Sequence, residues 1–287
     1  MNLLRKFVDL ILYSNIWIGL CAVAQIQHTY LLVGADRGLD FYSGFLFAAT
    51  LALYCLHRVI GIDRITEFTV SGRFKIITRY KQHIVVYGIL GLLGAIVAFL
   101  FLPLKAWALI AIPAVISVAY VLPLGKSGKR LRDYPVIKIF LIALNWSMLT
   151  AFVPVILYAD SVGVGWALLI LLERVLFTFA LTIPFDIRDV TVDVPSEIRT
   201  IPQILGIRKS KLVGMICIAA STILALGLIA AQVYPQFYII PVIVYGLIAS
   251  AVIRAAREER TDYYFAGLVD GVMIVGWLLL YVASVYV

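Results

Sequence analysis

Long apolar stretches recur along the whole chain, and each has about the length of one membrane crossing. Of the 287 residues, 63% are hydrophobic and only 14% are charged. A soluble domain has about 25% charged residues, whereas about 20 apolar helical residues span the ~30 Å hydrocarbon core of a bilayer. Within lipid, only helices or closed barrels satisfy their backbone polar groups, and the ten-residue alternation of a barrel is missing here. The sequence therefore predicts an all-α membrane protein with nine transmembrane helices, at about 7–33, 41–60, 83–102, 106–124, 136–158, 165–183, 211–232, 237–256 and 264–286.

Basic residues are distributed unequally between the predicted loops. Of the 24 Lys and Arg residues, only Arg37 and Lys105 fall in the loops of one side, and Arg174 lies within a span. Because Lys and Arg accumulate in cytoplasmic loops, the N-terminus is expected in the cytoplasm and the C-terminus on the opposite side. We expect one polytopic domain over residues 1–287, integral to the cell (inner) membrane. This topology accounts for most of the net charge of +8, so nucleic acid is not an expected partner.

The two longest predicted loops, about 61–82 and 184–210, both lie on the cytoplasmic side. They follow the second and the sixth predicted spans and contain apolar residues with short helical patterns. Long loops in compact proteins are usually functional or disordered. The composition of these two favours ordered helical caps.

Three aspartates follow the sixth span, at positions 186, 189 and 193. On a helix, this spacing places Asp186, Asp189 and Asp193 within about 60° of one another. Their carboxylates would repel one another unless a hard cation such as Mg²⁺ bound between them, since Mg²⁺ prefers carboxylate oxygens and commonly bridges to phosphate. The alternative is the solvated acidic face of an ordinary loop helix. Asp63 and Glu67 form a weaker acidic pair after the second span, and such a pair is common by itself.

Together, these motifs resemble those of the UbiA-type intramembrane prenyltransferases. The family's fold has nine transmembrane helices, with an NDxxDxxxD-like motif after the second and a DxxDxxxD-like motif after the sixth. The second motif matches fully at the three aspartates and is followed by the similar segment Arg199-Thr200-Ile201-Pro202. The first motif matches only at Asp63-Arg64 and Glu67, because Val59 and Ile60 stand where its leading Asn and Asp would be.

The resemblance implies a nine-helix bundle around a central cavity, in which an isoprenyl group passes from a prenyl diphosphate to a lipophilic, aromatic acceptor within the membrane. Mg²⁺ would neutralise the diphosphate and stabilise its departure, leaving an allylic carbocation that the acceptor captures. The implied metal ligands are Asp63, Glu67, Asp186, Asp189 and Asp193, of which Asp63, Asp186 and Asp189 would be catalytic. The implied diphosphate-binding residues are Arg58, Arg64, Lys129, Arg130 and Arg199, although membrane topology alone also accounts for Lys129 and Arg130. The expected partners are the two substrates and membrane lipid.

Further polar residues lie within or beside the spans. Ionisable groups inside a membrane are costly unless they are paired or hydrated, so Glu173 and Arg174 are expected to face the bundle interior, with Asp270 or Asn145 among the possible partners. A structural ion pair is favoured over a role in acceptor binding. His57 could offer a polar contact beside the incomplete first motif, and His28 is expected at the membrane interface.

Two other classes of function remain open. The chain could be a non-catalytic or transport-type membrane protein that keeps this fold with a decayed first motif, or a related transferase or cyclase that uses diphosphate lipids. Transporters usually have broken helices in matched halves, whereas the acidic residues here fall in predicted loops. That placement favours the enzyme.

Overall fold

The computed structural model describes residues 3–35, 37–65, 81–122, 131, 134, 137–190 and 200–286, with the backbone alone at 3–6, 61–65 and 81. The chain divides into two compact units. The first comprises Met1–Val23 and Leu39–Pro103, and the second comprises Ala24–Gly38 and Leu104–Val287. The boundary between Val23 and Ala24 falls within helix α2 (Ile16–Leu32).

The helices agree with the predicted spans. Within the described residues, eight helical segments are long and apolar enough to cross a membrane, and a bent helix pair near the N-terminus makes a ninth. The prediction of an all-α membrane protein is confirmed. The elements are α1 (Leu3–Tyr13), α2 (Ile16–Leu32), α3 (Phe41–Ile65), α5 (Lys81–Leu100), α6 (Leu104–Val121), α7 (Ile137–Ser147), η2 (Met148–Phe152), α8 (Val153–Tyr158), α9 (Val164–Arg188), α10 (Ile201–Leu205), α11 (Ile207–Ala230), η4 (Gln236–Tyr238), α12 (Ile239–Ala255), η5 (Tyr263–Val269) and α13 (Asp270–Val285).

The first predicted span is broken. Helices α1 and α2 meet at an angle of 68°, and between them Asn15 has a φ of 66°. Asparagine tolerates this left-handed conformation better than most residues. The side-chain amide of Asn15 donates to Sγ of Cys55 at 3.3 Å, which ties the bend to α3 within the first unit.

Small residues bring α3 and α5 close together in the first unit. A Cβ atom placed on Gly91 would lie 2.9 Å from both the carbonyl oxygen of Ala48 and the amide nitrogen of Ala52. One turn earlier, a Cβ on Gly88 would lie 3.1 Å from that of Cys55. Membrane helices commonly pack through such small residues because the backbones can approach closely.

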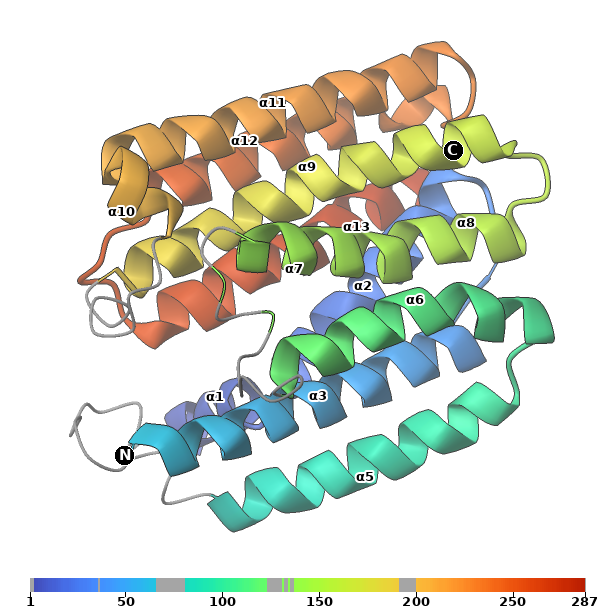
Figure 1. Ribbon diagram of the computed structural model, residues 1–287. Helices are drawn as coiled ribbons and strands as arrows, with labels where there is room; N and C mark the ends of the chain where they lie inside the picture. The colour runs from blue at the N-terminus through green and yellow to red at the C-terminus, as the bar shows by residue number, and fades with distance from the viewer. Residues whose placement is uncertain are drawn as a thin grey trace. The chain divides into compact units, whose positions relative to one another are not determined.

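Helix α9 occupies the interior of the second unit. It packs against α7, α11 and α12, and in Figure 1 it runs between α7 and α11. More than half of its membrane-length segment, 56%, is buried in protein. Its small and branched residues, such as Ala167 and Ile170, join an apolar cluster with Leu228 of α11 and Leu280 of α13. Most α9 side chains therefore face protein and not lipid.

The helices extend further into the predicted cap loops than the sequence indicated. The predicted loop 184–210 begins inside α9, which continues past Pro184 to Arg188. Proline lacks a backbone donor and crowds the carbonyl four residues earlier, yet the helix continues for one more turn. The same loop contains the short helix α10, which Thr200 and Gln203 start with a capping box. The predicted loop 61–82 begins inside α3, and most of its remainder lies outside the described residues.

Candidate functional site

Asp186 lies in the last turn of α9 and forms an ion pair with a residue from the first turn of α7. Its Oδ1 atom is 3.0 Å from Nζ of Lys138, and the residue is only 4% exposed. A buried carboxylate is costly unless it is paired and hydrogen-bonded. In the sequence, Lys138 is one of the many basic residues on the predicted cytoplasmic side, and only the structure places it beside the second Asp motif.

Asp189, which caps α9, is held by the preceding residue. Nε and Nη2 of Arg188 donate to its two carboxylate oxygens at 2.7 Å and 2.9 Å. The guanidinium also lies 4.0 Å from Asp262 and over the ring of Phe265, 5.5 Å from its centre. We call Lys138, Asp186, Arg188, Asp189 and Asp262 the α9-end cluster.

The predicted convergence of the three aspartates is tested only in part. Asp186 and Asp189 lie about one turn apart, and each contacts a different basic residue. In the described part of the chain, no group of three His, Cys, Asp or Glu side chains is arranged to hold a metal ion. Several predicted site residues lie outside the described residues, namely Glu67, Lys129, Arg130, Asp193 and Arg199, as do the side chains of Asp63 and Arg64 on α3.

Near the incomplete first motif, α3 is engaged in packing. Nη1 of Arg58 donates to the carbonyl oxygen of Tyr13 at 2.6 Å. Because Tyr13 is the last residue of α1, the cation also complements the negative end of that helix dipole. Val59 packs against the apolar cluster of Leu51, Cys55 and Ile84. His57 is half-buried on the same helix.

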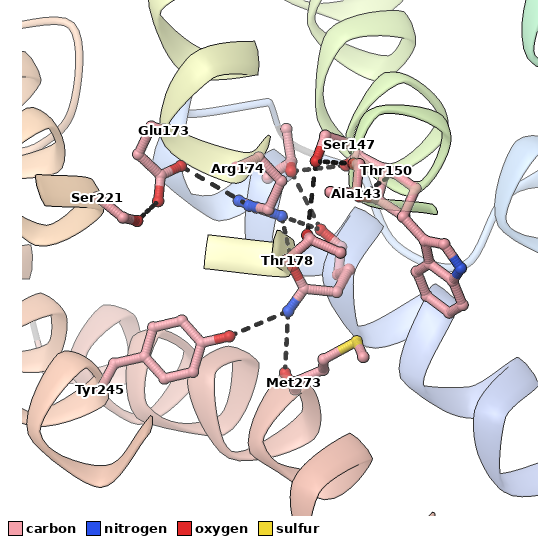
Figure 2. Close-up of polar contacts among 12 residues, drawn as sticks. Ala143, Ser147, Thr150, Glu173, Arg174, Thr178, Ser221, Tyr245 and Met273 are labelled. Atoms are coloured by element: carbon pink, nitrogen blue, oxygen red, sulfur yellow. Dashed lines mark hydrogen bonds and ion pairs between the residues drawn. The ribbon is translucent and has the colours of Figure 1, made fainter. Parts of the chain in front are cut away.

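Glu173 and Arg174 are buried within the second unit, as predicted for a paired membrane charge (Figure 2). Arg174 is 1% exposed. Its Nη1 atom donates to Oε1 of Gln25 at 2.6 Å, and its Nε atom is 3.7 Å from Oε2 of Glu173. The other carboxylate oxygen of Glu173 accepts a hydrogen bond from Ser221 at 2.8 Å.

Gln25 extends this interior network to two further helices. Its amide nitrogen is 3.2 Å from the hydroxyl of Tyr245 on α12 and 3.4 Å from the carbonyl oxygen of Met273 on α13. The network therefore joins α2, α9, α11, α12 and α13. His28, expected at the membrane interface, is instead buried in protein, with its ring centre 5.3 Å from that of Tyr245.

The possible partners named from the sequence interact elsewhere. The amide of Asn145 donates to Ser117 at 2.8 Å, and Asp270 acts electrostatically on Arg188. Gln25 and Ser221, which the sequence analysis missed, are polar residues within apolar spans. Listing every such polar residue would have found them, since a membrane helix usually turns its polar side chains toward protein.

The interior network and the α9-end cluster are separate sites. Arg174 and Asp186 are twelve positions apart on one helix, which corresponds to about 18 Å along its axis.

Comparisons with known proteins identify the fold. No family model matches the sequence, and no curated protein matches it. Among solved structures, a UbiA homologue from Aeropyrum pernix K1 matches with a TM-score of 0.64 at 11% identity, over 97% of this chain and 98% of that chain. A UbiA homologue from Archaeoglobus fulgidus bound to GPP and Mg²⁺ matches with a TM-score of 0.63 at 11% identity, over 96% and 98%. A digeranylgeranylglyceryl phosphate synthase matches with a TM-score of 0.60 at 15% identity, over 100% of both chains. The chain therefore has the fold of the UbiA-type intramembrane prenyltransferases, as its Asp motifs predicted.

Proposed function

We propose that this chain is a membrane-embedded, Mg²⁺-dependent prenyltransferase that moves an isoprenyl group from a prenyl diphosphate to a lipophilic acceptor. The observation that carries the proposal is the buried carboxylate of Asp186, followed by Asp189, at the end of a central helix in a UbiA-type fold. Two structural neighbours from Archaeoglobus fulgidus were solved with GPP and Mg²⁺ and with DMAPP and Mg²⁺.

The chemistry of the α9-end cluster fits a hard divalent cation. Asp186 and Asp189 supply carboxylate oxygens, the ligands that Mg²⁺ prefers. We propose that Asp193, Asp63 and Glu67, whose side chains lie outside the described residues, complete the set. When bound, the metal would supply Lewis-acid stabilisation of the departing diphosphate.

The protein's own residues would bind and orient the two substrates. We propose that Arg58, Arg64, Lys129, Arg130 and Arg199 provide positive charge for the diphosphate. The surrounding helices are apolar enough to hold an isoprenyl tail and to exclude water from the reacting carbon. Exclusion of water matters because an allylic carbocation is otherwise captured by water and not by the acceptor.

The proposal is tested by Mg²⁺-dependent binding and turnover of radiolabelled prenyl diphosphates with the purified, full-length protein. Asp186→Asn and Asp63→Asn remove a carboxylate with little change in shape, and both should weaken Mg²⁺-dependent binding by at least about tenfold. Asp160→Asn is the matched control, because it removes the same charge from an exposed turn after α8. Equal binding by the wild type and Asp186→Asn would refute the proposal.

A second candidate is a non-catalytic protein that keeps the fold. The observation in its favour is Val59, which stands where the family's first motif begins and packs into an apolar cluster. This candidate predicts that prenyl diphosphates and lipophilic acceptors yield no prenylated product, even where diphosphate binding is retained. Product formation that Asp186→Asn abolishes would exclude it.

A further inference from the structure

We propose that Lys138 and Arg188 are exchangeable counter-ions at the α9-end cluster. Without a bound metal they would neutralise Asp186 and Asp189, and on metal binding they would be transferred to the diphosphate. This inference rests on the proposed function and assigns diphosphate binding to Lys138 and Arg188, which are not among the diphosphate-binding residues that the family resemblance implies.

Lys138 is the counter-ion of Asp186 in the structure. The two side chains are 15% and 6% exposed, and the charged atoms are 3.0 Å apart. Removing one partner from such a buried pair leaves an uncompensated charge, which is strongly unfavourable. Any metal that binds Asp186 must therefore compete with the ammonium group. Lysine suits such an exchange because its compact charge is carried on a flexible four-carbon stem.

Arg188 has other contacts that can retain it after Asp189 turns toward a metal. Its guanidinium lies 4.0 Å from Asp262 and over two aromatic rings, with distances of 5.2 Å to the centre of Phe185 and 5.5 Å to that of Phe265. Aromatic faces and a second carboxylate both stabilise a guanidinium. Loss of the bidentate contact with Asp189 would therefore leave Arg188 at the cluster with its donors turned to a new anion.

Charge balance gives this exchange a direction. Before metal binds, the carboxylates of Asp186 and Asp189 balance the cations of Lys138 and Arg188, so these four groups attract a polyanion weakly. A divalent cation would take up these two carboxylate charges, which leaves Lys138 without its counter-ion and Arg188 with the more distant carboxylate of Asp262, 4.0 Å away. Since Coulombic attraction is strong in a partly buried site, the metal-loaded site would bind diphosphate far more tightly than the metal-free one. The proposal thus predicts that metal binds before or with the diphosphate.

The test compares two affinities in the full-length protein. Mn²⁺, which like Mg²⁺ favours carboxylate ligands, is titrated without diphosphate and followed by electron paramagnetic resonance of the free ion. Geranyl diphosphate binding is then measured at saturating Mg²⁺. Lys138→Gln should bind Mn²⁺ about tenfold more tightly and geranyl diphosphate about tenfold more weakly, which corresponds to one charged hydrogen bond in each case. Lys138→Arg keeps the charge and should lie close to the wild type in both titrations.

Lys211→Gln is the matched control. It removes the same charge from α11, where the Lys211 ammonium group donates to the backbone carbonyl of Arg254. Opposite shifts of the two affinities in Lys138→Gln, absent from Lys211→Gln, would support the exchange. An unchanged or weakened Mn²⁺ affinity in Lys138→Gln would overturn it.

Failure of the inference can be separated from failure of the proposed function. A wild-type protein that binds neither Mn²⁺ nor geranyl diphosphate would refute both. A wild type that binds both ligands, with Lys138→Gln indistinguishable from Lys211→Gln, would refute only the exchange. If Lys138→Gln does not fold, Arg188→Lys decides: loss of its bidentate contact with Asp189 should also tighten Mn²⁺ binding, and an unchanged or weaker affinity would refute the exchange.

Discussion

Replacing Arg174 by glutamine tests whether the interior network is structural. Arg174 is 1% exposed, donates to Gln25 at 2.6 Å and forms an ion pair with Glu173 at 3.7 Å. In Arg174→Gln, the carboxylate of Glu173 keeps its hydrogen bond from Ser221 but loses its counter-charge. The substitution therefore leaves a buried charge without compensation.

The expected cost follows from that uncompensated charge. Breaking a buried ion pair by removing one partner costs about 3–5 kcal/mol. For a chain of this size, each kcal/mol lowers the melting temperature by about 2–4 °C, so Arg174→Gln should melt on the order of 10 °C below the wild type. The double variant Glu173→Gln/Arg174→Gln removes both charges and should recover a large part of the loss, because neutral amides can hydrogen-bond with each other.

Thermal unfolding of the detergent-solubilised protein provides the measurement, with Arg254→Gln as a control at an exposed position on α12. Turnover well below the melting temperature separates stability from catalysis. A network about 18 Å from Asp186 should leave the KM for prenyl diphosphate unchanged. A melting temperature for Arg174→Gln equal to that of Arg254→Gln would refute the structural role, and so would a double variant less stable than the single one.

Three further features of the structure predict how a substitution changes the free energy of unfolding, which thermal unfolding measures. Gly91→Ala should destabilise by about 1–3 kcal/mol through overpacking, whereas Gly227→Ala, which meets open space, should stabilise by up to about 1 kcal/mol; equal effects would argue against close α3–α5 packing. Asn15→Val should lower the free energy of unfolding by about 1–3 kcal/mol, because the left-handed conformation strains a β-branched residue, and this loss should exceed that of Asn15→Gly. A larger loss in Asn15→Gly would contradict the left-handed conformation at the bend. Tyr245→Phe should cost about 1 kcal/mol, and no change would indicate that the Gln25 contact contributes nothing.

The spans could be predicted from sequence because lipid imposes one strong rule on them. A helix must satisfy its own backbone and present apolar side chains over about 20 residues, so composition alone locates it. The same rule does not determine the local backbone conformation within or beside a span. The break at Asn15 depends on one residue in a left-handed conformation, and the extension of α9 beyond Pro184 depends on its neighbours.

The second Asp motif could be found from spacing, but its partners could not. Lys138 is 48 positions before Asp186 in the chain, and only the packing of α7 against α9 brings them together. On a continuous helix, Arg188 would point about 200° away from Asp186, so spacing alone does not indicate that Arg188 contacts the motif. At the end of a helix, however, the next residue leaves the helical path, which allows Arg188 and Asp189 to face each other.

The continuity of α9 means that its two polar regions cannot be adjusted independently. Val164 to Arg188 form one continuous helix, and Arg174 and Glu173 connect that helix by hydrogen bonds to Gln25 of α2 and Ser221 of α11. A rotation of α9 by about 100°, the angle between successive residues of a helix, would carry Asp186 away from Lys138. Variation of the interior polar residues among related chains should therefore be accompanied by compensating changes at the far end of the same helix.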